Sequence, residues 1–91
     1  MRIIATRTLK DYSEKFPAAK QCLYAWNDEM ESGKWNSPNE LKEQYRSASI
    51  LTNKRVVFNI HGNRFRLIVD IEYRFRFVFI VGLERINNMI K

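Results

Sequence analysis

A chain of 91 residues can form one small domain, and its formal charge of +6 favours an anionic partner such as nucleic acid, an acidic protein or an anionic membrane surface. The single cysteine, Cys22, excludes an internal disulfide and a cysteine-based zinc site, and it lies in a helical pattern typical of a buried thiol. There is no apolar run of about 18 residues and no leader-like segment, so we expect a cytoplasmic protein with no membrane partner.

The N-terminal part of the chain predicts a strand and two helices. Residues 1–5 include two β-branched positions and suit an edge strand. Thr8 is the expected N-cap of a first helix that breaks near Phe16, because a proline follows. A second helix from Ala18 should end at Gly33, where a C-cap glycine belongs. The apolar stripe of this second helix consists of Ala19, Leu23, Trp26 and Met30.

The middle of the chain carries its sharpest local signal. Ser37 is a hydroxyl N-cap, Pro38 suits the first helical position, and Glu40 supplies a carboxylate three residues after the cap. These residues predict a short third helix that runs to about Tyr45. The small and polar residues 46–53 then predict a loop or a short extended segment.

Residues 55–81 predict a three-stranded antiparallel meander. In the first and second strands one face alternates as Val56, Phe58, Ile60 and then Phe65, Leu67, Val69, Ile71 and Tyr73. The third run separates Phe75, Phe77, Phe79 and Val81 from Arg74, Arg76, Val78 and Ile80. Between the first two strands, Gly62 and Asn63 tolerate the positive φ that a tight hairpin needs. Residues 82–91 have helical spacing and predict a short terminal helix.

These elements predict an α+β fold in a single domain spanning residues 1–91. An N-terminal strand and two to three helices should pack on the antiparallel meander. The helices should cover the sheet face formed by Val56, Phe58, Phe65, Leu67, Val69 and Ile71.

Basic side chains gather in and beside the meander, where Lys54, Arg55, Arg64, Arg66, Arg74 and Arg76 outnumber Asp70 and Glu72. Guanidinium groups match phosphate oxygens, so such a surface can hold a nucleic-acid backbone. A solvated face whose cations protect strand edges explains the same charges equally well. His61 is the only histidine, and a lone histidine in a turn is more often a polar turn residue than a catalyst. The residue pattern contains no metal-ligand, nucleophile or phosphate-loop motif, so we expect no metal and no cofactor.

Two stretches, AWNDEMESGKWNSPNELKEQYRSASIL and RVVFNIHGNRFRLIVDIEY, resemble the HigB toxin family of bacterial type II toxin–antitoxin modules, within the RelE-like group. The resemblance covers residues 1–80. It implies a RelE-like fold and a metal-free endoribonuclease, an mRNA interferase, that cleaves mRNA, often on the ribosome. It also implies a helix-turn-helix antitoxin, HigA-like and encoded beside the toxin, that holds the enzyme inactive.

The resemblance also implies how the site works. The ribose 2′-hydroxyl attacks the neighbouring phosphate, while basic side chains stabilise charge and protonate the leaving oxygen. The matching positions are Arg46, Asn59, Asn63, Arg64 and Arg66. We therefore predict Arg64 and Arg66 as catalytic residues, with His61 as the available acid–base group. The predicted RNA-binding residues are Arg46, Lys54, Arg55, Asn59, Asn63, Arg74 and Arg76.

The end of the chain departs from the family, whose last strand usually continues as I-R-F/W-x-G-T-H-x-x-Y-D-K and supplies a histidine, a tyrosine and an aspartate. Here the chain reads FIVGLERINNMIK. Codons that encode INNMIK can encode His-Gln-Gln-Tyr-Asp-Lys when read one base earlier, which suggests the hypothesis of a frameshifted toxin. The alternatives are a toxin-derived domain that binds antitoxin or RNA without cleavage, and an unrelated nucleic-acid-binding module, which explains the charge but not the matching segments.

Overall fold

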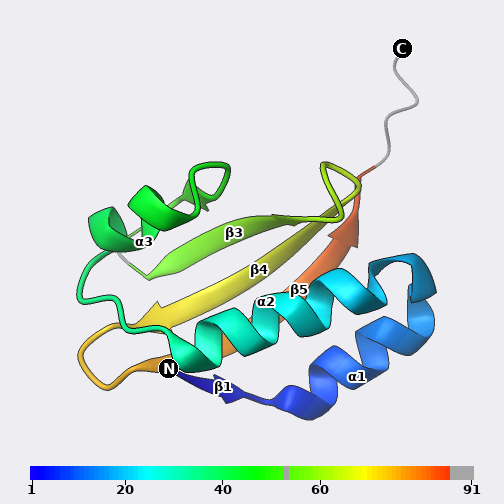
Figure 1. The fold of residues 1–91 in the computed structure, drawn as a ribbon, viewed down its shortest axis with the longest axis horizontal. Helices are drawn as coiled ribbons and strands as arrows, with labels where there is room; N and C mark the ends of the chain where they lie inside the picture. The colour runs from blue at the N-terminus through cyan, green and yellow to red at the C-terminus, as the bar shows by residue number, and fades with distance from the viewer. Residues whose placement is uncertain (53, 87–91) are drawn as a thin grey trace.

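The computed structural model describes residues 1–52 and 54–86 and has an α+β fold, as predicted (Figure 1). Its elements are β1 (Arg2–Ile4), α1 (Thr6–Lys15), a 3-10 turn η1 (Pro17–Ala19), α2 (Lys20–Ser32), α3 (Pro38–Gln44), β2 (Ser49–Ile50), β3 (Arg55–Ile60), β4 (Phe65–Glu72) and β5 (Phe77–Arg85). The strand order is β1-β5-β4-β3-β2, in which β1 runs parallel to β5 and the other neighbours are antiparallel.

The core lies between α1, α2 and one face of this sheet. The predicted inward residues of β3 and β4 are all buried, namely Val56, Phe58, Phe65, Leu67, Val69 and Ile71. Trp26 of α2 packs edge-on against Phe58 with 5.5 Å between ring centroids, and Phe16 lies 5.3 Å from Phe65. The opposite face of the sheet, called the open face below, is not covered by these helices (Figure 1). None of the helices described is long and apolar enough to cross a membrane.

The first two helices follow the prediction except at their ends. The helix α1 begins at Thr6 after Ala5, and no side chain caps it, so the prediction of a Thr8 cap is wrong. The amide of Thr8 donates to the carbonyl of Ala5 at 3.0 Å, which places Thr8 inside the first turn. The predicted break near Phe16 is confirmed. Gly33 is the C-cap of α2 but its backbone is extended; a Cβ at this position would collide with the Trp35 ring.

The short helix α3 forms as its sequence predicts. The hydroxyl of Ser37 accepts a hydrogen bond from the Glu40 amide at 3.3 Å, and the Glu40 carboxylate accepts one from the Asn36 amide at 3.1 Å. The following loop contains β2, the short extended segment expected there. In the hairpin between β3 and β4, positive φ falls on His61 and Gly62, so the expectation is correct for the glycine and wrong for Asn63.

The third strand shows which side of its alternation faces the core. Val78 pairs with Ile71 and is buried, while Phe79 pairs with Asp70 and is exposed on the open face. Phe75 lies in the turn before the strand and is also exposed.

The predicted helix over residues 82–91 is wrong where the structure describes it, because β5 continues to Arg85. Gly82 pairs with Ile68 and Glu84 with Arg66, across a β-bulge at which Val81 has no partner in β4. The extra residue shifts the alternation by one and turns Leu83 toward the core. The rest of that prediction, residues 87–91, lies outside the described residues.

Candidate nucleic-acid interface

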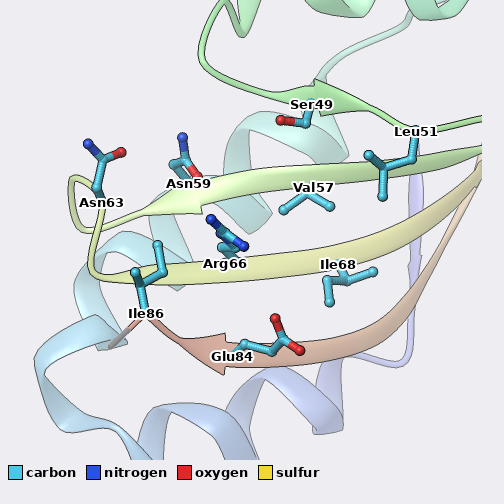
Figure 2. A pocket seen from close by; sticks show the side chains of 9 residues that line it. All are labelled: Ser49, Leu51, Val57, Asn59, Asn63, Arg66, Ile68, Glu84 and Ile86. Atoms are coloured by element: carbon cyan, nitrogen blue, oxygen red, sulfur yellow. The ribbon is translucent and has the colours of Figure 1, made fainter. Parts of the chain in front are cut away.

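The open face carries a groove of about 530 Å³ near the turn between β3 and β4 (Figure 2). We call it the Arg66 groove. Its lining residues come from four neighbouring strands and the segments beside them, and they are Ser49, Leu51, Val57, Asn59, Asn63, Arg66, Ile68, Glu84 and Ile86.

Arg66 lies at the centre of this groove. Its register partners are Asn59 on β3 and Glu84 on β5, so three strands place these side chains in one row (Figure 2). The Arg66 side chain is exposed and forms no ion pair with any of the described residues. A guanidinium with free N–H donors and no anionic partner can bind two phosphate oxygens at once.

Two asparagines extend the polar surface of the groove. Asn59 donates from its amide nitrogen to the carbonyl of Ser47 at 3.1 Å, which fixes the side chain at the edge of the groove. Asn63 is exposed in the turn after β3. Both are predicted RNA-binding residues, and the structure brings both together with Arg66.

Glu84 is absent from the predicted site residues because the sequence of residues 82–91 predicts a helix. The alternation of β5, continued beyond its bulge, places Glu84 on the open face beside Arg66. A carboxylate at this position lowers the positive potential of the groove, but it also provides a group that can accept a proton. The signal available in the sequence was the length of the preceding strand, because the eight residues of Phe65–Glu72 need a longer partner than residues 77–81 provide.

The other two predicted catalytic residues lie outside the Arg66 groove. Arg64 is exposed in the turn before β4 and lines a separate depression of about 270 Å³ that also includes Ala18 and Arg85. His61 lines a third pocket, of about 250 Å³, between α2 and the end of β3. The structure therefore does not bring Arg64, Arg66 and His61 into one cavity, and their catalytic roles stay predictions.

The lining of the His61 pocket combines polar and aromatic side chains. The Nδ1 atom of His61 lies 3.7 Å from the Cys22 thiol. The Tyr45 hydroxyl donates to Glu29 at 2.8 Å, and burial together with this hydrogen bond raises the pKa of Tyr45. Among the described residues, no group of three or more histidine, cysteine or acidic side chains is placed to hold a metal ion.

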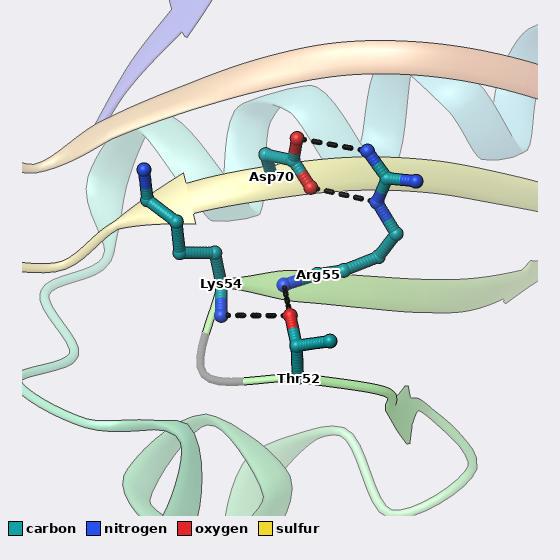
Figure 3. A network of polar contacts seen from close by, with 4 residues as sticks. All are labelled: Thr52, Lys54, Arg55 and Asp70. Carbon is teal, nitrogen blue, oxygen red and sulfur yellow. Dashed lines mark hydrogen bonds and ion pairs between the residues drawn. The ribbon is translucent and has the colours of Figure 1, made fainter.

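At the other end of the meander the predicted RNA-binding residue Arg55 is already engaged by a carboxylate (Figure 3). Arg55 forms a two-pronged contact with Asp70, at 2.8 and 3.0 Å, and this hydrogen bonding holds the pKa of the Asp70 carboxyl below its usual range. Lys54 lies 3.8 Å from Glu72. The Thr52 hydroxyl accepts from the amides of both Lys54 and Arg55, which orders the start of β3.

The remaining predicted RNA-binding residues are scattered. Arg74 and Arg76 are exposed in the turn between β4 and β5, at the opposite end of β4 from Arg66. Arg46 is exposed after α3, and its carbonyl accepts a hydrogen bond from Lys42 at 2.7 Å. The Arg66 groove thus collects Arg66, Asn59 and Asn63, and the other predicted RNA-binding residues lie outside it.

Comparisons with known proteins match most of this fold. A family model described as HigB_toxin, RelE-like toxic component of a toxin-antitoxin system, matches residues 19–83. The mRNA interferase toxin HigB of Escherichia coli K12 is 33% identical over 70 residues, which is 75% of this chain and 67% of that protein. The mRNA interferases HigB of Escherichia coli O157:H7 and Shigella flexneri match to the same extent. The matched range includes Arg66, Asn59 and Asn63 and ends one residue before Glu84.

Proposed function

The chain belongs to the HigB family of RelE-like toxins, and from this we propose that it is an mRNA interferase that binds single-stranded mRNA across the Arg66 groove. As a toxin of this family it has an antitoxin partner and an RNA substrate. We further propose that the antitoxin is a HigA-like helix-turn-helix protein, that the mRNA is cut on the ribosome, and that both place the toxin in the cytoplasm.

The free guanidinium of Arg66 is the observation that carries this proposal. Arg55 lies on the same face but is held by Asp70, so it has little capacity left for a phosphate. Arg66 has no such partner within the described part of the chain, and Asn59 and Asn63 offer amide donors beside it. A backbone phosphate seated in the groove would be neutralised by Arg66, with an affinity that falls as salt rises.

The proposed chemistry is an internal transfer at phosphorus. The ribose 2′-oxygen forms a bond to the adjacent phosphorus as the bond to the 5′-oxygen of the next nucleotide breaks. Arg66 stabilises the negative charge that grows on the phosphate oxygens. In the chain as written, the Glu84 carboxylate accepts the proton of the 2′-hydroxyl and solvent water protonates the departing 5′-oxygen, which makes the reaction slow. His61 faces the α2 side near Cys22.

A second candidate function, binding without efficient cleavage, is favoured by the sequence of residues 81–91. This segment contains no histidine, tyrosine or aspartate. General acid–base groups typically contribute about 10²- to 10⁴-fold to a rate. As written, the chain should therefore bind RNA and cleave it slowly.

The frameshift hypothesis extends to this whole segment. When codons for Val81 to Lys91 are read one base earlier, they can encode Arg-Trp-Phe-Gly-Thr-His-Gln-Gln-Tyr-Asp-Lys. This product follows Ile80 with the full I-R-W-x-G-T-H-x-x-Y-D-K pattern of the family. Synonymous codon choice is free at the third base, and also at the first base for Leu83 and Arg85, so the second and third bases of the other shifted codons are fixed by the protein sequence. The gene sequence tests the idea directly, since a shifted frame with stop codons or unrelated residues removes it.

The test of function compares the chain as written with a variant whose residues 81–91 are replaced by that alternative peptide. The replacement removes Glu84 and supplies a histidine, a tyrosine and an aspartate as acid–base groups. We expect similar affinity for a single-stranded RNA, and mRNA cleavage that is about 10²- to 10⁴-fold faster in the rebuilt protein. Rapid cleavage by the chain as written, lost in Arg66→Ala but unchanged in His61→Ala, would show that the rebuilt segment is not needed. Failure of both proteins to cleave free or translated mRNA would overturn the interferase proposal.

The partner proposal is tested by growth. Induced expression of the rebuilt toxin should arrest growth, and co-expression of the helix-turn-helix protein encoded beside it should restore growth. Cleavage of a translated mRNA but not of the same free mRNA would support action on the ribosome. Arrest that the neighbouring protein does not relieve would contradict its identity as the antitoxin.

A further inference from the structure

A second region of the open face is apolar and exposed. It consists of Ile4 on β1 and Phe77, Phe79 and Val81 on β5, and we call it the phenylalanine patch. Ile4 pairs with Phe79 in the parallel β1–β5 register, so the patch is continuous across two strands. Ile4, Phe79 and Val81 are 36%, 43% and 46% exposed, and Phe77 is half-buried.

The side chains of this patch do not belong to the core that stabilises the sheet. The helices bury the other face of β5 through Val78, which is fully buried. Phenylalanines that alternate outward on a solvated face bury only part of their rings in the folded chain, and contiguous exposed apolar groups usually mark an interaction surface. Val81 adds to the patch because the β-bulge removes its partner in β4.

The charges around the patch are predominantly positive. Arg2 is the β1 neighbour of Phe77, and Arg76 accepts, through its carbonyl, a hydrogen bond from the Arg2 amide at 2.8 Å. Arg2, Arg74 and Arg76 form no ion pair with residues 1–52 and 54–86. The nearby carboxylates of β4, Asp70 and Glu72, are already paired with Arg55 and Lys54. The positive charge that remains unpaired on this side therefore favours an acidic partner.

RNA is a poor fit for the same surface. The rings of Phe77 and Phe79 are tilted by 54° with centroids 6.2 Å apart, so they do not present parallel stacking surfaces to successive bases. A second copy of this chain fits poorly too, because two patches facing each other would bring their unpaired arginines together.

We propose that the phenylalanine patch is the docking surface for an acidic amphipathic segment of the antitoxin. Apolar side chains of that segment cover Phe79 and its neighbours, and its carboxylates face Arg2, Arg74 and Arg76. The proposal rests on the antitoxin partner of the proposed function and adds the place and chemistry of the contact. Arg66 and Asp70 are four residues apart on β4, which corresponds to about 13 Å, so a docked segment lies beside the Arg66 groove and competes with RNA for access to the open face.

The main experiment measures the affinity of the full chain for the purified helix-turn-helix protein encoded beside it. Phe79→Ser should weaken binding at least about 10-fold, because a buried aromatic anchor is lost. Tyr24→Ser is the matched control, since Tyr24 is an aromatic residue of similar exposure, 38%, on the helical layer. Its affinity should stay that of the unchanged chain. Thermal unfolding of both variants checks that they fold, and because Phe79 and Tyr24 are similarly exposed, the two substitutions should change the melting temperature by similar small amounts.

A charge reversal provides an independent arm. Arg2→Glu should weaken antitoxin binding, and the loss should shrink as salt is raised. Arg7→Glu is the control, because Arg7 is exposed on α1, away from the open face. Equal losses in Arg2→Glu and Arg7→Glu would mean that only net charge matters, which would overturn the proposed location.

The remaining outcomes separate the other possible occupants. If the Phe79→Ser variant binds the antitoxin normally but loses affinity for a single-stranded RNA oligonucleotide, the patch is an RNA-binding surface and the proposal is overturned. Sedimentation that shows a dimer of the unchanged chain and a monomer of Phe79→Ser would overturn it in favour of self-association. If the unchanged chain does not bind the neighbouring protein at all, that partner and this surface are both overturned, whereas normal binding by Phe79→Ser overturns the surface alone.

Discussion

Each end of the open face carries an arginine, but within the described residues only one of the two is paired with a carboxylate. Arg55 and Arg66 lie on adjacent strands, face the same side, and each has a carboxylate as a cross-strand neighbour, Asp70 and Glu84 respectively. Only Arg55 forms the ion pair, and its hydrogen bonds to Asp70 raise its pKa further. Arg66 has no ion pair within the described residues and lines a groove.

A count of arginines in the sequence therefore does not locate an RNA-binding site. Arg55 contributes to the basic composition, but Asp70 already holds its guanidinium, and Lys54 lies 3.8 Å from Glu72. Cations that remain available, such as Arg66, determine where phosphate can bind. The predictions below test this contrast.

The largest expected effect is on the free energy of unfolding, through the core that lies beneath both arginines. Leu67 is fully buried on the inner side of β4, directly beside Arg66 in sequence. Leu67→Ala should lower the free energy of unfolding by about 2 to 5 kcal/mol, because it leaves a cavity in a small core. Denaturant unfolding measures this. A loss under about 1 kcal/mol would contradict the assigned inner face of β4.

The next largest effect is on the rate of mRNA cleavage, in which the two arginines should differ. In the protein with residues 81–91 rebuilt, Arg66→Ala should slow mRNA cleavage about 10²- to 10³-fold, the usual effect of losing one donor to transition-state charge. Arg55→Ala is the matched control and should change the rate much less, since Asp70 already holds its guanidinium. Single-turnover cleavage rates provide the comparison. Equal losses would mean that the Arg55–Asp70 pair opens to contact RNA.

A smaller effect concerns the salt dependence of RNA binding. Arg66→Gln should reduce the slope of log affinity against log salt concentration by about 0.7 to 1, since it removes one phosphate contact. Arg55→Gln should leave the slope nearly unchanged. Titrations of a fluorescent single-stranded RNA across salt concentrations measure both slopes, and an unchanged slope in Arg66→Gln would place the phosphate elsewhere.

The smallest effect is a pH dependence of stability at the paired end. The hydrogen bonds from Arg55 lower the pKa of Asp70 below its ordinary 3.8, so the pair stabilises the fold above about pH 3.8 and loses that contribution as the pH falls through the lower, folded pKa. Asp70→Asn should therefore make the unfolding free energy less dependent on pH below about pH 4. Asp28→Asn, at an exposed position on α2, is the control. Identical acid unfolding curves for Asp70→Asn and the unchanged chain would show that the pair contributes nothing.

Local chemistry was enough to predict several elements from sequence. The Ser37 cap and Glu40 contact are made within a few residues, so their signal survives in any context that lets α3 form. The inward residues of β3 and β4 follow from the two-residue period of a strand. Of the candidate site, Arg66, Asn59 and Asn63 were predicted and lie together.

Only the tertiary structure decided the rest, because it depends on partners distant in the sequence. Whether residues 82–85 form a helix or a strand was settled by pairing with β4, and the bulge at Val81 then set which side chains face the groove. The same pairing turned Phe79 outward and brought Glu84 to Arg66. Hydrophobic period and capping are properties of neighbouring residues, whereas register, ion pairing and the contents of a groove are properties of strands brought together by the fold.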